Sequence, residues 1–238
     1  VAAVAALDPY IAQRAVELIE VEYEELPAVF SVEDATAEGA LLVHDISQGN
    51  VSLVRKINYG DLEGMFQKAD YVREDTFRVH AVQHAYMEPC ACIAEPDEGG
   101  RITMYTSTQT PYIVQCLLAS TLGIPENHVR VKKVTVGGGF GGKMELRPWE
   151  FCAAFMARRT GRPVKFTLSR TDELAFGRRR HGMTLYSKVG FSKDGKLLAK
   201  DFQVMLDGGA YNAMGPTATF LCGTFGNMAY RLPAYRYF

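Results

Sequence analysis

The chain opens with an apolar pattern that predicts a strand, a helix and a second strand. Residues Val1–Leu7 are all apolar, and Val21–Glu24 alternates apolar and charged side chains, so both segments are expected to be extended. Between them, Asp8 and Pro9 are typical of a helix start, because Asp can cap the first free amides and Pro suits the first helical position. The following apolar side chains share one helical face: Ile11, Ala15, Leu18 and Ile19. This unit is predicted to close near Pro27.

The pattern changes after this unit. Up to about Asn50 the sequence is acidic, contains Ala and Gly, and is weakly periodic, which is typical of a linker. From Tyr71 onward, short β-branched and aromatic runs predict many strands, separated by helices that begin near Gln109 and Glu145. The predicted strands include Tyr71–His80, Ile102–Thr106 and Val129–Val136. A second domain is therefore expected to begin near Tyr71.

A long hairpin is predicted over Met183–Leu206. Two alternating runs flank Lys193-Asp194-Gly195-Lys196, and Asp-Gly supplies the positive backbone angles of a tight turn. Together with the separate helices, this hairpin indicates the α+β class.

Composition and charge narrow the classes of partner. The 238 residues are 47% hydrophobic, which is enough for one large or two modest cores. The 26 basic and 27 acidic side chains give a net charge of -1, so no overall field attracts nucleic acid or an anionic membrane. Apolar runs stay shorter than the roughly 18 residues of a membrane span. We therefore expect a soluble, cytoplasmic protein with no nucleic-acid or membrane partner.

The cysteines and the first residue carry further expectations. Five dispersed cysteines without a Cys-x-x-Cys pair argue against a disulfide framework or a thiolate iron–sulfur site. The chain begins with Val and opens directly into an apolar run, so we expect upstream sequence to be missing.

A glycine loop from Gly137 to Lys143 is the most distinctive feature of the sequence. Five of the six residues 137–142 are glycines, and they lie between a β-branched strand and a predicted helix, Glu145–Arg159. Without Cβ atoms, successive amides can point into one concavity that favours a phosphate or oxo group. A tight turn alone would need only one or two glycines, so a ligand is the favoured interpretation.

Two nucleotide-binding motifs overlap this loop, and each departs from its pattern. Gly137, Gly142 and Lys143 have the phosphate-loop spacing, but Met144 stands where a hydroxyl residue would bind magnesium. The dinucleotide spacing Gly-x-Gly-x-x-Gly is also present, yet Gly161-Arg162-Pro163 offers no acid for a ribose hydroxyl. A noncatalytic nucleotide- or phosphate-binding module that uses Gly137–Lys143 remains the alternative function, and an assembly or scaffold piece is a third hypothesis.

The string Gly-Gly-Gly-Phe-Gly-Gly-Lys after a Val-rich strand resembles the molybdopterin-binding segment of the xanthine oxidase and aldehyde oxidase family. Ser107–Thr110 is similar to the family's Ser-Thr-Gln segment, and Leu122–Pro125 stands at the usual interval between the two. Further similar segments are Thr160–Val164 and Arg180–His181, while Ala12–Ala15 and Tyr23–Pro27 resemble the end of the family's α/β hammerhead domain. Nearly the whole chain is covered.

The resemblance implies a domain division and a set of partners. Residues 1–35 would be the C-terminal part of the hammerhead domain, 36–70 a linker, and 71–238 the first, incomplete molybdopterin-binding domain. The implied cofactor is molybdenum–molybdopterin, with or without a nucleotide extension. The implied partners are the remaining part of the molybdenum subunit, iron–sulfur and FAD domains or subunits, and a small-molecule substrate. The implied reaction hydroxylates a carbon with water-derived oxygen, or runs as the reverse reduction.

The resemblance also assigns residues. The pterin dithiolene holds the metal, so no direct protein ligand is expected. Gln109 should donate its amide to an oxo ligand of molybdenum, and Gly138, Gly139, Phe140 and Gly141 should line the cofactor. The structural alternative for Gln109 is a cap on its own helix. The family's catalytic Glu lies far toward the C-terminus and has no counterpart here, so no catalytic residue is expected in this chain and the chain alone should be inactive.

Met144 is the residue expected to contact substrate. It stands where purine-oxidising relatives carry a Glu, and its apolar side chain argues against a purine and favours an aromatic, aldehyde or thioester substrate. The alternative for Met144 is simply the first turn of a buried helix.

Three other groupings favour structural roles. His80, His84, Cys90 and Cys92 match no zinc spacing, so buried polar roles are preferred to a metal site. The basic run Arg178–His181 is interpreted as solvated surface or as a contact with acidic neighbours. Asp172-Glu173 is interpreted as a helix start rather than half of an acid–base pair.

Overall fold

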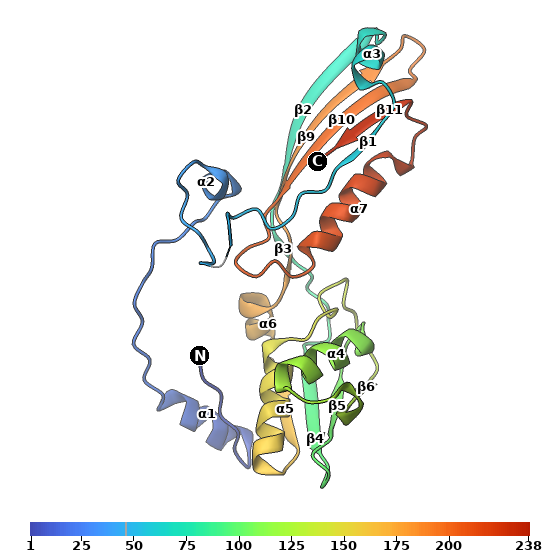
Figure 1. The fold of residues 1–238 in the computed structure, drawn as a ribbon. Helices are drawn as coiled ribbons and strands as arrows, with labels where there is room; N and C mark the ends of the chain where they lie inside the picture. Colours follow the sequence, from blue (N-terminus) through green and yellow to red (C-terminus); the bar gives the residue numbers. More distant parts are fainter. Residues whose placement is uncertain (46) are drawn as a thin grey trace. The chain divides into compact units, whose positions relative to one another are not determined.

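The computed structural model describes residues 1–45 and 47–238 and divides them into two compact units (Figure 1). Ile46, in the expected linker 36–70, lies outside the described residues. Unit 1 comprises Val1–Glu24 and Gln83–Arg180, and unit 2 comprises Glu25–Val82 and His181–Phe238. The predicted α+β class is confirmed.

Unit 1 is a sheet of four strands in the order β6-β5-β4-β7 with two helices packed on it. Its strands are β4 (Ala91–Pro96), β5 (Ile102–Thr106), β6 (Val129–Lys133) and β7 (Val164–Thr167). Its helices are α1 (Pro9–Glu17), α4 (Pro111–Leu122), α5 (Pro148–Thr160) and α6 (Arg170–Phe176), with a 3-10 turn at Glu126–His128. Strands β5 and β6 are parallel, and the connection between them contains α4.

The core of unit 1 is built from alternate strand positions and small helix residues. Ile102 and Met104 of β5 are fully buried, as the period-two pattern of that strand requires. Three alanines let α5 approach β4 closely: Ala153, Ala154 and Ala157.

Unit 2 is a sheet of five strands in the order β1-β11-β10-β9-β2. Its strands are β1 (Ile57–Tyr59), β2 (Tyr71–Val79), β9 (Met183–Phe191), β10 (Leu197–Leu206) and β11 (Ala234–Tyr237). Helix α7 (Gly215–Met228) runs along the sheet (Figure 1), and the two short helices are α2 (Val32–Thr36) and α3 (Leu62–Gln67). The two-residue strands β3 (Val82–Gln83) and β8 (Arg179–Arg180) form a further small sheet.

Several predicted elements are confirmed with small shifts at their ends. The hairpin is β9–β10, and Gly195 has φ 79° at its turn. Asp8 caps α1 by accepting from the amide of Ile11 at 2.9 Å. Helices α4 and α5 begin two and three residues later than predicted, because Pro111 and Pro148 occupy their first turns.

The two strands predicted at the N-terminus are wrong. Within the fully described range 1–24, Val1–Leu7 and Val21–Glu24 carry no strand. An apolar or alternating run becomes a strand only when a neighbouring strand accepts its backbone hydrogen bonds, and periodicity does not supply that neighbour. The stretch 36–70 contains β1 and α3. The division into 1–35, 36–70 and 71–238 stays a prediction.

Candidate functional site

Two connecting segments of unit 1 meet at the carboxyl ends of β5 and β6. Because these strands are parallel neighbours, the residues that follow Thr106 and those that follow Lys133 leave the sheet at the same edge. The amide of Val134 donates to the carbonyl of Thr106 at 3.2 Å and continues the contact beyond the sheet. This topology brings Ser107–Thr110 and the glycine loop together, although about thirty residues separate them.

The glycine loop is tightly curved. Gly138 and Gly141 have φ of 92° and 91°, which glycine adopts without steric cost, and the amide of Gly142 donates to the carbonyl of Gly139 at 2.7 Å. Phe140 has φ of 50°, a conformation that strains a residue with a Cβ, and its side chain is 74% exposed. Left-handed non-glycine residues of this kind concentrate at functional sites.

The other three glycines are required by close neighbours. A Cβ at Gly139 would lie 2.4 Å from Oε1 of Gln109, and one at Gly137 would lie 2.6 Å from Cβ of Glu88. A Cβ at Gly142 would lie 2.9 Å from both His84 and Tyr86. The loop is therefore a backbone cradle pressed between two sets of side chains.

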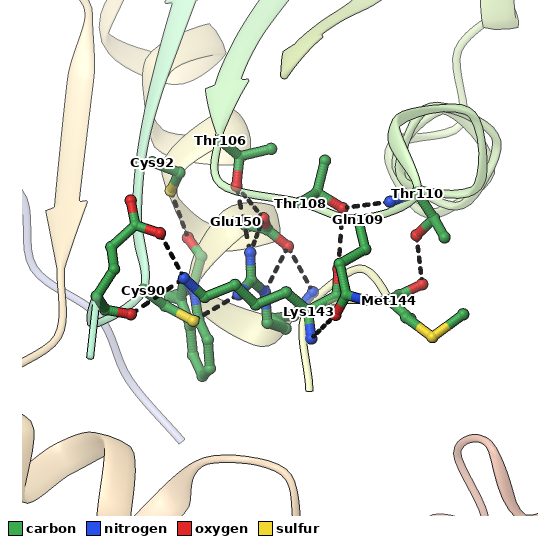
Figure 2. Close-up of polar contacts among 12 residues, drawn as sticks. Cys90, Cys92, Thr106, Thr108, Gln109, Thr110, Lys143, Met144 and Glu150 are labelled. Carbon is green, nitrogen blue, oxygen red and sulfur yellow. Dashed lines mark hydrogen bonds and ion pairs between the residues drawn. The ribbon is translucent and has the colours of Figure 1, made fainter. Parts of the chain in front are cut away.

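Residues 108–110 hold the end of this cradle (Figure 2). Oε1 of Gln109 accepts from the amides of Gly141 and Lys143 at 3.1 and 3.2 Å. The Lys143 carbonyl accepts from the Gln109 amide at 2.8 Å and from the Thr108 hydroxyl at 3.1 Å. Gln109 thus bonds the loop rather than capping its own helix.

Alternate residues of the segment before β4 line the other side of the loop. The His84 ring lies against Gly142, and Tyr86 packs against Gly142 and under the ammonium of Lys143, whose Nζ is 4.5 Å from the ring centroid. Oε2 of Glu88 accepts from the Gly137 amide and from Lys143 Nζ, each at 2.7 Å.

Sequence reasoning missed Tyr86 and Glu88 and assigned no loop contact to His84. Their period-two spacing is the one available signal, because it would place residues 84, 86 and 88 on one side of a regular strand. The segment is irregular in the structure, since Ala85 has φ of 50° and the chain bends at residues 87 and 88. That spacing gives no information on which distant segment the side chains meet.

A buried charged network lies behind the cradle. The Arg147 guanidinium donates to Glu150 at 2.6 Å and also contacts the Cys90 sulfur, while Glu150 accepts from the Thr106 hydroxyl. Glu173 accepts from the Tyr86 hydroxyl at 2.6 Å and from the Cys90 amide. Arg147, Glu150 and Glu173 are at most 2% exposed, so each charge depends on these partners.

This environment sets the protonation states of the network. Burial raises the pKa of the Cys90 thiol to about 11, against the opposing effect of Arg147. Burial also raises the pKa of Tyr86, and its hydrogen bonds to Cys90 and Glu173 act in the same direction. For Glu173, burial favours the neutral acid, but the hydrogen bonds with Cys90 and Tyr86 outweigh it and lower the pKa. Near pH 7, Glu173 is therefore ionised and Cys90 is a neutral thiol.

Several polar groups at the cradle have no hydrogen-bond partner among the described residues. They are the amides of Gly138, Gly139 and Phe140, Nε2 of Gln109 and the buried hydroxyl of Ser107. Buried polar atoms without partners are uncommon in native proteins, and among these groups the Ser107 hydroxyl is such an atom. Gln109 and Phe140 are exposed, so their donors are open to solvent or to a ligand.

Lys143, in contrast, is fully buried and bonded to Glu88. It cannot reach a phosphate as a phosphate-loop lysine does without breaking this pair.

The remaining candidates fall in separate places. Met144 is half-buried, its carbonyl accepts from Thr110 at 2.6 Å, and it precedes α5 rather than forming its first turn. Arg178 pairs with Glu145 at 2.9 Å, the acidic contact expected for the basic run. Asp172 belongs to the capping box that starts α6, which confirms the predicted helix start. Among residues 1–45 and 47–238, no group of three or more His, Cys, Asp or Glu is placed to hold a metal.

No described helix has both the length and the apolar character needed to cross a membrane.

Comparison with known proteins identifies related sequences. Residues 43–238 match the family described as molybdopterin cofactor-binding domain. The chain is 37% identical over 216 residues to the nicotinate dehydrogenase large molybdopterin subunit of Eubacterium barkeri, covering 91% of this chain and 50% of the relative. It is 38% identical over 236 residues to a probable xanthine dehydrogenase subunit of Bacillus subtilis, covering 99% of this chain and 31% of the relative.

Solved structures show the same arrangement of the chain. The aldehyde oxidoreductase of Desulfovibrio gigas matches 97% of this chain and 25% of its own, with a TM-score of 0.89 and 27% identity. The quinoline 2-oxidoreductase of Pseudomonas putida 86 matches 98% of this chain and 30% of its own, with a TM-score of 0.84 and 30% identity. The chain thus spans half or less of the length of each of these proteins.

Proposed function

The chain belongs to the molybdopterin cofactor-binding domain family, and from this premise we propose that it forms part of the molybdenum subunit of an oxidoreductase that hydroxylates carbon with oxygen from water. One observation carries the proposal: Gln109 and the glycine loop are hydrogen-bonded into one cradle, several of whose donors are left without partners among the described residues. When bound, the molybdenum–pterin group supplies the two-electron oxidation of the substrate carbon.

The residues of the cradle fit such a group. The amides of Gly138, Gly139 and Phe140 are successive donors without an acceptor among the described residues, which suits the oxygen-rich ligand shell of an oxo metal. Gln109 uses its carbonyl oxygen on the loop and keeps its NH₂ group available. A neutral amide stabilises oxo charge without competing for the metal. These features support the predicted roles of Gln109, Gly138, Gly139 and Phe140.

Gly141 is the fourth loop residue expected to line the cofactor, and this role stays a prediction. Its N–H is engaged by Gln109, so its contribution to the proposed site is conformational, through its φ of 91°. We place Gly141 behind the cofactor-facing amides, as the residue that turns the loop back toward Gln109.

Met144 remains the proposed substrate contact. It follows directly after the cradle and is held by Thr110 through its carbonyl, so its flexible side chain is free to adapt to a flat apolar substrate. We propose an aromatic, N-heterocyclic, aldehyde or thioester substrate in preference to a purine. Nicotinate and quinoline in the names of two relatives are consistent with this class.

The rest of the proposed reaction requires groups outside this chain. We propose that the catalytic base lies on the remaining part of the molybdenum subunit, and that electrons pass to iron–sulfur and FAD centres on partner domains or subunits. A cytoplasmic location is part of the same proposal.

The test is metal and pterin analysis of the intact protein. Stoichiometric molybdenum, together with the fluorescence of oxidised pterin, is the expected result, and Gln109→Leu should lower both because it removes the amide. A protein without molybdenum that binds ATP or inorganic phosphate in calorimetry would instead support the nucleotide- or phosphate-binding module. The engagement of Lys143 by Glu88 counts against that alternative.

A further inference from the structure

One carboxylate oxygen ties the two ends of the glycine loop together. Oε2 of Glu88 accepts from the amide of Gly137, the first residue of the loop, at 2.7 Å. The same oxygen accepts from Nζ of Lys143, the last residue of the loop, at 2.7 Å. Nζ also donates to the Glu88 carbonyl at 3.0 Å. The loop is therefore closed into a ring whose fixed point is Glu88.

The buried charge of Lys143 makes its contact with Glu88 hard to replace. The Lys143 side chain is completely buried, and Glu88 is its only carboxylate within 4.0 Å among the described residues. The ammonium also lies over the face of the Tyr86 ring, with Nζ 4.5 Å from its centroid. A buried ammonium without a carboxylate is strongly unfavourable, so Glu88 both neutralises the lysine and fixes its position.

The geometry at the start of the loop adds a steric constraint. A Cβ at Gly137 would lie 2.6 Å from Cβ of Glu88, so the Gly137 backbone and the Glu88 side chain leave no room for a larger residue. Gly138, Gly139 and Phe140 follow directly, and these are the residues whose amides lack partners within the described part of the chain. A shift of Gly137 would rotate those amides.

We propose that Glu88 is a positioning residue that sets the curvature of the glycine loop, so that the amides of Gly138–Phe140 converge on the cofactor without Glu88 touching it. That the ordered loop holds the cofactor rests on the proposed function. That Glu88 orders the loop is independent of it.

The experiment compares four variants of the intact protein: Glu88→Gln, Lys143→Met, the double variant, and Glu95→Gln as a control. Glu95 lies on β4 in the same unit, is exposed, and accepts from the Tyr105 hydroxyl at 3.3 Å. Each variant is measured for hydrogen exchange of peptides covering 137–143, for thermal unfolding, and for pterin and molybdenum content. Exchange is recorded on protein produced without cofactor as well as on loaded protein.

Glu88→Gln should lose about tenfold or more in retained pterin, as outer-shell substitutions do, and its loop amides should exchange about tenfold faster. The double variant is the decisive case, because it removes the buried charge together with its partner. We expect its unfolding temperature to return close to that of the wild type while pterin retention stays low and loop exchange stays fast. The control should match the wild type in all three measurements.

Recovery of pterin and of slow exchange in the double variant would overturn the proposal, because Glu88 would then only neutralise Lys143. If the wild-type protein contains no pterin, the proposed function fails instead. The exchange measurement still decides the inference in that case, and loop exchange in Glu88→Gln equal to that in Glu95→Gln would refute it.

Discussion

Replacing Gly139 by Ala tests whether the two motifs act as one structure. The three atoms nearest to the added methyl all belong to Gln109: Oε1 at 2.4 Å, Cδ at 2.8 Å and Cγ at 3.2 Å. The φ of Gly139 lies outside the left-handed region, so the substitution adds little backbone strain. The methyl therefore acts on the protein almost entirely through the Gln109 side chain.

The magnitude follows from the bonds that Gln109 must give up. To clear the methyl, its amide must withdraw from the amides of Gly141 and Lys143. Each hydrogen bond contributes a net of about 0.5–1.5 kcal/mol, so Gly139→Ala should cost about 1–3 kcal/mol. Gln109→Ala removes the same two bonds. In the double variant those three atoms are absent, so its cost should equal that of either single variant rather than their sum.

The assay is denaturant unfolding of the intact protein, combined with hydrogen exchange of residues 137–143 and pterin content. Gly99→Ala is the matched control in the same unit, because its Cβ would lie 3.4 Å from the nearest atom, an Asp97 oxygen. Additive costs in the double variant, or a Gly139→Ala protein that behaves like the control, would refute the proposed link between Gln109 and the loop.

Three further predictions concern the buried network. Arg147→Met leaves the carboxylate of Glu150 buried without its cation and should cost about 3–5 kcal/mol in denaturant unfolding, whereas Lys188→Met, which breaks a solvent-exposed pair, should leave the unfolding free energy close to that of the wild type. The pKa of Glu173 is lower in the folded protein than in the unfolded chain. Ionised Glu173 therefore stabilises the fold above the ordinary Glu pKa, and this contribution is lost as the pH falls through the pKa in the folded state. The stability difference between wild type and Glu173→Gln should therefore be larger at pH 7 than at pH 3, and a difference independent of pH would contradict this. Since burial raises the pKa of Cys90 to about 11, iodoacetamide at pH 8 should leave it unlabelled in the native protein and label it after unfolding, as read by mass spectrometry.

The sequence predicted the local elements of the sheets well, because their signals are local. Alternation in Ile102–Thr106 and the Asp-Gly turn of the long hairpin are properties of consecutive residues, and both match the structure. The N-terminal strands failed because a strand also needs a partner, which no local pattern supplies. Pro111 and Pro148 shifted two helix starts that their own preference for the first turn could have located.

The candidate site was predictable only in part. The glycine loop and Gln109 follow from their own residue types and from the resemblance. Glu88 and Tyr86 carry no motif and no resemblance of this kind, since a Glu and a Tyr in a connecting segment are ordinary surface or core residues until the topology places the loop against them. The buried network of Arg147 and Glu173 was equally hidden, because charged residues in sequence indicate solvent exposure unless their partners are known.

The structure also changes the reason for the glycines. From sequence alone, five glycines exceed what a turn requires, which favours a ligand that approaches the backbone. In the folded chain each of the five already has an internal reason: Gly138 and Gly141 adopt positive φ, and Gly137, Gly139 and Gly142 leave room for Glu88, Gln109, His84 and Tyr86. The glycine content by itself therefore no longer argues for a ligand. The case for a ligand rests instead on two observations: the amides of Gly138–Phe140 and Nε2 of Gln109 have no acceptor among the described residues, and the Ser107 hydroxyl beside them is buried without a partner. Internal packing gives no reason for a folded protein to leave that buried hydroxyl unbonded.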